Sequence, residues 1–404
     1  DRDGPDNGAV LSPDGKWLAY IGFDDRKQGF QRSTLHIIPA GGGVPKILSD
    51  DIDRSIRGMK WDPNSKSIVV MYNNHGMGIM GRFGLNGKFT EITQTGQSSA
   101  FTISDNGKIA LTHIDTKTSP EIAIVGKGGA LNQITHVNAD LLENRTLGEV
   151  EEIWYKSSYD GQDIQGWIIK PPNFDPNNKY PMVIKIHGGP FSDYGFRFNY
   201  EMQLMVAQGY VMLYTNPRGS TGYGEEFSNA IHHAYPGHDF EDLNSGVDAV
   251  VDLGFVDEDR LYVTGGSGGG VLTAWMIGNT NRFKAAAIHY PVIEWQSFNL
   301  TADIHGLVNQ YWFPDLPWRA VEHYAKRSLL SVVDNVETPT IIITGEHDWR
   351  TPINQAEQYY SALKINGVEA VNVRIPDEPH GTSVHPSHHI TRIMNTMGWF
   401  ESHN

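Results

Sequence analysis

The sequence contains no cysteine among its 404 residues. Disulfide bonds, a thiolate nucleophile and cysteine-ligated zinc are therefore excluded. Basic residues are also scarce, because 32 Lys and Arg face 47 Asp and Glu, which gives a formal net charge of −15. Binding to nucleic acid requires a concentrated basic surface, so neither nucleic acid nor an anionic membrane is an expected partner.

Long apolar runs are missing as well. No stretch approaches the roughly 20 apolar residues of a membrane span, and the start lacks the basic and then apolar character of a signal peptide. The chain begins at Asp1 instead of a methionine, so we expect a processed or truncated product without its signal region. With 39% hydrophobic residues it should be soluble and globular. The compartment, periplasmic or cytoplasmic, stays open.

A turn-rich element recurs in the first 145 residues. Its copies read Ser-Pro-Asp-Gly-Lys at 12–16, Asp-Pro-Asn-Ser-Lys at 62–66 and Ser-Asp-Asn-Gly-Lys at 104–108, each before a short β-rich run. Such spacing is typical of propeller blades. Residues 1–145 are therefore predicted to form a partial β-propeller of about three blades. Propellers generally close with about four to eight blades, so we expect the remainder on missing residues, a companion chain or a second copy.

From residue 146 to 404 the pattern changes to alternating strands and helices. Apolar runs at 152–157, 164–170, 181–186, 210–215, 261–264, 285–288 and 340–344 alternate with helical segments such as 240–253 and 354–363. This alternation predicts a mainly parallel sheet covered by helices on both faces. The second part is therefore predicted to be a three-layer α/β-hydrolase domain.

The strongest chemical signal is Gly-Gly-Ser-Gly-Gly at 265–269. It follows the strand 261–264 and precedes a helical segment at 271–276, as a nucleophile elbow requires. Ser267 is therefore the predicted nucleophile. A glycine-rich phosphate loop is the alternative, but the dinucleotide pattern fails at Val271 and no P-loop lysine follows.

A serine hydroxyl needs a base and a group that orients the base, and in this fold the acid precedes the histidine in the chain. Asp348 lies just after the strand 340–344, and His380 follows the strand 371–375. We predict these two as acid and base. Glu346 competes as the acid, and the competing histidines, in the expected last helix, are His385, His388 and His389.

An acyl-transfer enzyme also needs donors for the oxyanion. The first predicted donor is the N–H of Gly268, directly after the nucleophile. The second is the N–H of Gly189, chosen over Gly188, in His-Gly-Gly-Pro at 187–190 after an early strand. Six of the 17 histidines form groups at 232–238 and 385–389 that resemble metal clusters. Histidine-rich sequences produce such groups readily, so no metal or cofactor is expected.

Together these motifs resemble the prolyl oligopeptidase family of serine peptidases, in particular its acylaminoacyl-peptidase and dipeptidyl-peptidase branch. The resemblance rests on residues 187–191, Asn-Pro-Arg-Gly-Ser-Thr-Gly-Tyr-Gly at 216–224, and residues 265–270, 345–352 and 380–381. It implies an α/β-hydrolase domain capped by a propeller that cleaves short peptides near their N-terminus. It also implies that Arg350, two residues after the aspartate, binds substrate; a structural ion pair is the alternative.

The resemblance leaves acyl-peptidase and dipeptidyl-peptidase activity open. It implies a P1 pocket near the aromatic residues that follow Pro291, although such residues more often form ordinary core: Trp295, Phe298, Trp312, Phe313 and Trp318. A carboxylesterase would use the same machinery, because fold alone does not define the substrate. A binding module with an idle site is the alternative from another class.

Overall fold

The computed structural model describes residues 3–94 and 96–404, which form two compact units. The first unit runs to Thr146 and also includes residues 193–199 and 221–228. The second consists of residues 147–192, 200–220 and 229–404. None of the helices in the described residues combines the length and the apolar character that a membrane crossing requires.

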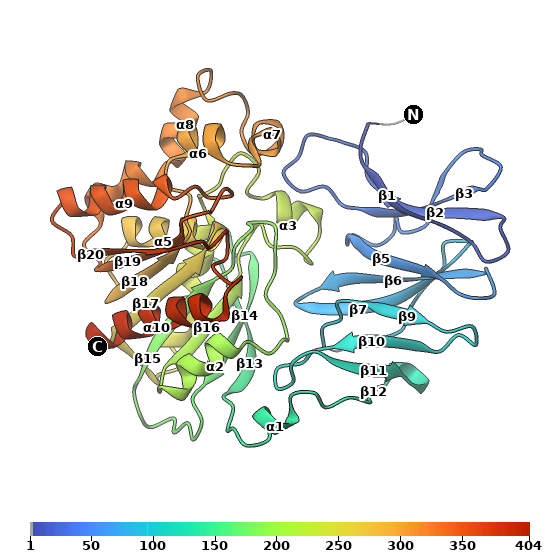
Figure 1. The fold of residues 1–404 in the computed structure, drawn as a ribbon, viewed down its shortest axis with the longest axis horizontal. Coiled ribbons are helices and arrows are strands. Elements are labelled where there is room, and N and C mark those ends of the chain that lie inside the picture. The colour runs from blue at the N-terminus through green and yellow to red at the C-terminus, as the bar shows by residue number, and fades with distance from the viewer. Residues whose placement is uncertain (1–2, 95) are drawn as a thin grey trace. The chain divides into compact units, whose positions relative to one another are not determined.

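The first unit contains three antiparallel sheets of four strands each, and the strands of each sheet are consecutive in the chain (Figure 1). The first sheet has β1 (Asp6–Leu11), β2 (Trp17–Gly22), β3 (Thr34–Pro39) and β4 (Lys46–Ile47). The second has β5 (Ile56–Trp61), β6 (Ser67–Asn74), β7 (Met77–Gly84) and β8 (Phe89–Glu91). The third has β9 (Phe101–Ile103), β10 (Ile109–His113), β11 (Glu121–Val125) and β12 (Leu131–Gln133). Helix α1 (Ala139–Leu142) follows.

Each predicted turn joins the first two strands of a sheet. In the first copy, the Ser12 hydroxyl donates to Asp14 over 2.7 Å and accepts the Trp17 N–H at 3.0 Å. The third copy repeats this with Ser104, whose hydroxyl donates to Asn106 and accepts the Lys108 N–H. The hydroxyl thus satisfies a backbone donor that a tight turn leaves unpaired, which explains the recurring pattern.

Strand β6 shows how these sheets share their cores. Successive side chains of a strand point to opposite faces. Ile68, Val70 and Tyr72 pack in one buried cluster with residues of the first sheet. Val69 and Met71 pack in a second cluster with residues of the third sheet. The middle sheet is therefore covered on both faces, as a blade between two neighbours is.

The second unit is built on one eight-stranded sheet with the order β13-β14-β16-β15-β17-β18-β19-β20. Its strands are β13 (Glu149–Lys156), β14 (Asp163–Lys170), β15 (Tyr180–Ile186), β16 (Val211–Asn216), β17 (Val256–Gly266), β18 (Ala285–His289), β19 (Thr340–Gly345) and β20 (Ala370–Ile375). Pairing is antiparallel from β13 to β16 and parallel from β16 to β20. The carboxyl ends of the parallel strands therefore meet at one edge.

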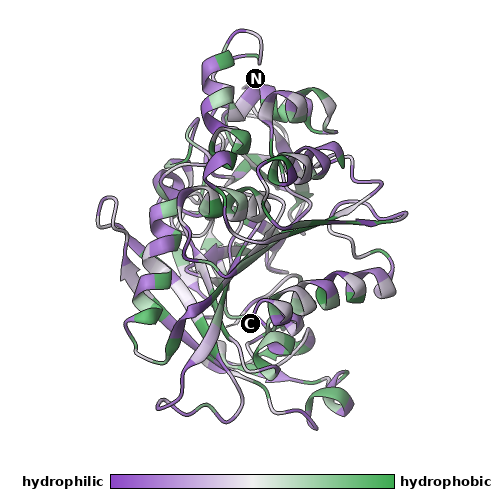
Figure 2. Cartoon of the chain, turned by 90° about the vertical axis from the view of Figure 1, so that its left-hand side faces the viewer, coloured by the Kyte–Doolittle hydropathy of each residue, from purple (hydrophilic) through white to green (hydrophobic). Residues whose placement is uncertain are grey.

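Helices cover both faces of this sheet, and green, hydrophobic colour appears on strands and on parts of the helices (Figure 2). Helices α2 (Tyr200–Ala207) and α10 (Pro386–Ser402) pack on one face. The main core lies under α4 (Asp239–Val251), α5 (Gly268–Asn279) and α9 (Asn354–Ile365) on the other. Shorter helices are α3 (Glu225–Asn229), α6 (Trp295–Thr301), α7 (His305–Leu307) and α8 (Val321–Arg327). The predicted fold, an α/β-hydrolase domain preceded by an incomplete propeller, is confirmed.

Candidate active site

Ser267 lies in the sharp turn between β17 and α5. Its φ of 59° and ψ of −122° lie in a region that residues with a side chain rarely adopt. The Ser267 N–H donates to the carbonyl of His289 over 3.0 Å, and the Ser267 carbonyl accepts the Val271 N–H at the start of α5. These bonds hold the strained turn, and the half-buried serine sits at the carboxyl edge of the sheet.

The flanking glycines are required by close backbone contacts. A Cβ on Gly265 would lie 2.4 Å from the carbonyl oxygen of Gly269. A Cβ on Gly269 would lie 2.2 Å from the carbonyl oxygen of Ile186 in β15. Neither distance is possible for real atoms, so the turn, the helix and β15 approach this closely only because side chains are absent.

Asp348 and His380, which the sequence predicts as acid and base, are in direct contact. The His380 Nδ1 donates to Asp348 Oδ2 over 2.8 Å. The Asp348 side chain is fully buried and also accepts the backbone N–H groups of Arg350 at 2.9 Å and Thr351 at 2.8 Å. An ionised carboxylate only accepts hydrogen bonds, so His380 carries its proton on Nδ1 and directs the Nε2 lone pair away from Asp348.

The Tyr290 ring links His380 to the turn that carries Ser267. Its centroid lies 4.8 Å from that of the His380 ring, with the planes tilted by 68°. A Cβ on Gly266, next to Ser267, would lie 2.7 Å from atoms of the same tyrosine ring. Burial raises the pKa of Tyr290, so its phenol remains neutral. His380 and the turn at Ser267 thus pack against one neutral aromatic ring.

The two predicted oxyanion donors lie beside each other. A Cβ on Gly268 would lie 3.0 Å from the backbone nitrogen of Gly189. Tyr235 stabilises the backbone at Gly268, because its hydroxyl donates to the Gly268 carbonyl over 2.6 Å. Burial raises the pKa of Tyr235 well above its ordinary value, which keeps this hydroxyl protonated.

His187 connects the loop of Gly189 to the end of β16. Its Nε2 lies 2.9 Å from the Ser220 hydroxyl, and its Nδ1 lies 2.8 Å from the Gly188 carbonyl. The Ser220 hydroxyl in turn donates to the Pro217 carbonyl over 2.6 Å. The position of the Gly189 loop therefore depends on the segment that follows β16.

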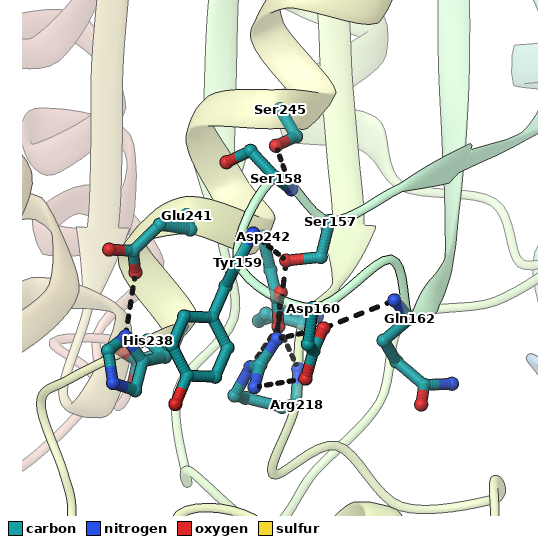
Figure 3. Close-up of polar contacts among 12 residues, drawn as sticks. Ser157, Ser158, Tyr159, Asp160, Gln162, Arg218, His238, Glu241, Asp242 and Ser245 are labelled. Atoms are coloured by element: carbon teal, nitrogen blue, oxygen red, sulfur yellow. Dashed lines mark hydrogen bonds and ion pairs between the residues drawn. The ribbon is translucent and has the colours of Figure 1, made fainter.

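A buried arginine holds that segment, and Figure 3 shows it between two carboxylates. The Arg218 guanidinium donates to Asp242 on α4 over 2.9 and 2.7 Å and to Asp160 over 3.1 and 3.2 Å. Asp242 also accepts the Arg218 backbone N–H at 2.8 Å. Tyr159 stacks on His238 with centroids 3.5 Å apart and lies 4.9 Å from the guanidinium carbon. Bidentate pairs of this kind impose one geometry on the loop.

Arg350 makes the ion pair that the sequence left as the alternative to substrate binding. Its Nε and Nη2 donate to Asp303 over 2.7 and 3.3 Å. Hydrogen bonding to Arg350 lowers the pKa of Asp303. Both side chains remain 44% exposed.

The competing residues have other partners. The Glu346 carboxylate accepts from Arg374 over 3.1 Å on the surface. His385 precedes α10 as its N-cap residue and, with His388, contacts Glu378. His389 lies 3.2 Å from Glu201.

Of the aromatic residues near the expected P1 pocket, Trp295, Phe298 and Phe313 are buried in the main core, and Trp312 packs against it. Trp318 is 63% exposed.

Sequence reasoning missed three residues that organise the site: Tyr235, Tyr290 and Thr351. The Thr351 hydroxyl lies 2.9 Å from both the Tyr290 carbonyl and Asp348 Oδ2, and it therefore links Asp348 to the end of β18. Its position three residues after Asp348 fits a local aspartate turn and could have drawn attention to it. The two tyrosines act through ring packing and a distant carbonyl, which leave no local pattern in the sequence.

Comparison with known proteins gives a consistent result. The sequence model described as "Prolyl oligopeptidase family" matches residues 196–404, just over half of the chain. An uncharacterised peptidase, YuxL of Bacillus subtilis, is 37% identical over 309 residues, which cover 76% of this chain and 47% of YuxL. Dipeptidyl-peptidase 5 of Porphyromonas gingivalis is 27% identical, covering 98% of this chain and 59% of that protein.

Among solved structures, the acylaminoacyl peptidase of Pyrococcus horikoshii superposes with a TM-score of 0.88 at 27% identity. The match covers 97% of this chain and 62% of the archaeal chain. The chain thus spans about half to three fifths of the length of these relatives.

Proposed function

Because this chain belongs to the prolyl oligopeptidase family of peptidases, we propose that it is a serine peptidase that hydrolyses short peptides near their N-terminus. Ser267 is the nucleophile, His380 the general base and Asp348 the residue that orients the base. One observation carries the proposal: the 2.8 Å hydrogen bond from His380 Nδ1 to a buried carboxylate, at the sheet edge where the Ser267 turn lies.

In the first step, Ser267 Oγ attacks the scissile carbonyl carbon while His380 Nε2 takes the hydroxyl proton. The bond from His380 Nδ1 to Asp348 leaves the Nε2 lone pair available for this transfer and stabilises the imidazolium that forms. His380 then gives the proton to the leaving amine, and the peptide bond breaks to leave an acyl-enzyme on Ser267.

In the second step, water attacks the acyl-enzyme with His380 again as base, and the ester bond to Ser267 breaks. Each tetrahedral intermediate carries a negative oxygen, which accepts hydrogen bonds from the N–H groups of Gly268 and Gly189. No residue of this mechanism requires a cofactor.

Arg350 is proposed to bind substrate while it remains paired with Asp303. The guanidinium has five N–H donors, and Asp303 accepts two of them. The other N–H groups of this half-exposed side chain can donate to a backbone carbonyl or to a blocked N-terminus of the peptide. Asp303 then serves to fix the orientation of Arg350.

We further propose that residues 1–145 and 146–404 are separate domains and that additional blades complete the propeller. The β1 strand supports the additional blades, because all six of its residues are exposed, including the apolar Val10 at 42% and Leu11 at 54%. The blades would come from the same polypeptide, a companion chain or a second copy. Native mass spectrometry of the purified protein distinguishes the three by the mass of the assembly.

Labelling with a fluorophosphonate probe tests the proposed chemistry. Wild-type protein should be labelled and should cleave N-acetylated or free-amino peptide anilides. The Ser267→Ala variant should lose both the labelling and the cleavage while its fold stays intact. The preferred anilide distinguishes an acyl-peptidase from a dipeptidyl-peptidase.

Two results would overturn the peptidase proposal. Labelling with turnover of matched esters but not of amides would identify a carboxylesterase. Folded wild-type protein that is not labelled would indicate a binding module with an idle site.

A further inference from the structure

Three side chains with metal-ligating atoms converge beside the segment that carries His380. They are Glu378, between β20 and α10, His385, the N-cap residue of α10, and His388 in its first turn. The ligand atoms, one from each residue, all lie within 4.8 Å of one another. We propose that Glu378, His385 and His388 bind one divalent transition-metal ion of the zinc type, independently of the proposed peptidase activity.

The arrangement of hydrogen bonds around Glu378 leads to this proposal. Its Oε1 accepts from three donors: the His385 N–H at 2.8 Å, His385 Nδ1 at 2.7 Å and His388 Nδ1 at 3.1 Å. Its Oε2 accepts the Val384 N–H at 3.1 Å. A single cation can replace both imidazole donors at Oε1, and the two backbone bonds, which orient the carboxylate, can remain.

The donor set selects the class of ion. One carboxylate oxygen with two imidazole nitrogens suits zinc and neighbouring first-row metals, whereas calcium and magnesium prefer oxygen ligands alone. Neutral imidazoles would ligate through Nδ1 and carry their proton on Nε2 instead, so a neutral ring needs only a change of tautomer. Three protein ligands leave a fourth position for water.

Binding such an ion requires the three ligand atoms, which lie within 4.8 Å of one another, to adjust their spacing. Zinc lies about 2.0–2.2 Å from nitrogen and oxygen ligands, which in a tetrahedral site places neighbouring ligand atoms roughly 3.3 Å apart. The two Oε1–Nδ1 distances, 2.7 and 3.1 Å, must therefore open by about 0.6 and 0.2 Å, and the two Nδ1 atoms, which lie within 4.8 Å of each other, must reach the same spacing. The side chains of His385 and His388 are 51% and 31% exposed, which allows this movement and gives the ion access from solvent.

The ion would stabilise the local structure and would take no part in the proposed catalytic reaction. Glu378 lies two residues before His380, while His385 and His388 belong to the start of α10. A bound ion would thus join the segment of the general base to the helix that follows it. The expected consequence is a raised melting temperature with bound zinc.

A metal titration of tag-free protein tests the site. After treatment with a chelator, wild type should bind one equivalent of Co²⁺ with a visible absorption band, and Zn²⁺ should displace it and raise the Tm. His388→Asn keeps a polar side chain beside Glu378 but lacks the imidazole. Mutating a residue that only hydrogen-bonds a metal ligand already lowers metal affinity roughly 10–100-fold. Losing the His388 ligand itself should therefore weaken binding at least about 10-fold.

His136→Ala, which removes an exposed histidine of the first unit, should bind as wild type does. The double variant His385→Ala/His388→Ala should lose the band and the Tm shift. The proposal fails if wild type binds no Co²⁺ at 1 mM, on the order of the weakest biological metal sites. It also fails if folded variants of His385 and His388 retain wild-type affinity.

Discussion

The substitution Asp348→Asn tests the role of the buried carboxylate with little change in volume. Asparagine can keep its carbonyl oxygen toward the N–H groups of Arg350 and Thr351, which the Asp348 Oδ1 accepts at 2.9 and 2.8 Å. The amide nitrogen then takes the place of Oδ2, which lies 2.8 Å from His380 Nδ1. This nitrogen is a donor, so His380 must present an unprotonated Nδ1 to it.

The consequence for catalysis follows from the tautomer. With Nδ1 unprotonated, a neutral His380 carries its proton on Nε2 and has no lone pair there to accept the proton of Ser267. In other enzymes with a serine triad this change lowers kcat by roughly 10⁴, which corresponds to about 5 kcal/mol in the activation free energy. Because Asp348 contacts no substrate in the proposed mechanism, KM should change little.

Steady-state turnover of the preferred anilide, with circular dichroism to confirm folding, measures this effect. The matched control is Glu346→Gln, which removes the other acidic side chain of the same loop; it pairs with Arg374 on the surface and should retain kcat within about 3-fold. The reasoning is refuted if folded Asp348→Asn retains kcat within 10-fold, on the order of 1.4 kcal/mol, or if Glu346→Gln has the larger effect.

Three further predictions concern stability. Asp242→Asn should lower the free energy of unfolding by about 3 kcal/mol, because it weakens a buried ion pair with Arg218; urea unfolding measures it. Burial raises the pKa of Asp239 from 3.8 to about 7. Between these two pH values, Asp239 is protonated in the folded state and ionised in the unfolded state. The free energy of unfolding therefore falls with rising pH by up to about 1.4 kcal/mol per pH unit. Asp239→Asn should remove this slope. Gly269→Ala should cost about 3 kcal/mol or more in thermal unfolding, since its Cβ would lie 2.2 Å from the Ile186 carbonyl.

Each of these three stability predictions has a control or an outcome that would contradict it. Asp315→Asn removes an exposed ion pair with Arg319 and should cost less than about 1 kcal/mol; equal losses would contradict the importance of burial. Parallel pH profiles of wild type and Asp239→Asn would show that Asp239 titrates normally. Gly398→Ala lies in α10 with open space around the added methyl group, so it should stabilise by about 0.5–1 kcal/mol; a similar loss at both glycines would contradict the steric argument.

Local sequence patterns predicted most of the strands and helices of the fold. The turn hydroxyls of Ser12 and Ser104 act within five residues along the chain, and strand and helix periods depend on neighbouring residues. These features were therefore readable from the sequence, and the three blade-like sheets and the strands from β14 to β19 lie where it placed them. The candidate residues Ser267, Asp348 and His380 could also be named, because each follows a parallel strand and such strands end at one edge.

Features that depend on long-range contacts were decided only by the tertiary structure. Residues 193–199 and 221–228 lie within the part of the chain from 146 to 404, which the sequence predicts as the hydrolase domain, but they join the first unit. There, for example, Asn73 donates to Asp193 over 2.7 Å. Likewise, Arg350 meets Asp303 across 47 residues of the chain. No spacing rule covers contacts at such separations.

The same distinction separates motif from geometry at the candidate site. The sequence by itself determined the residue types and their order, because a nucleophile elbow and strand-end loops are local structures. It did not determine that the Tyr290 ring packs on His380 or that Tyr235 holds the Gly268 carbonyl. Those contacts arise only when separate strands and loops pack together, since packing in three dimensions depends on the shapes of side chains that are distant in the sequence.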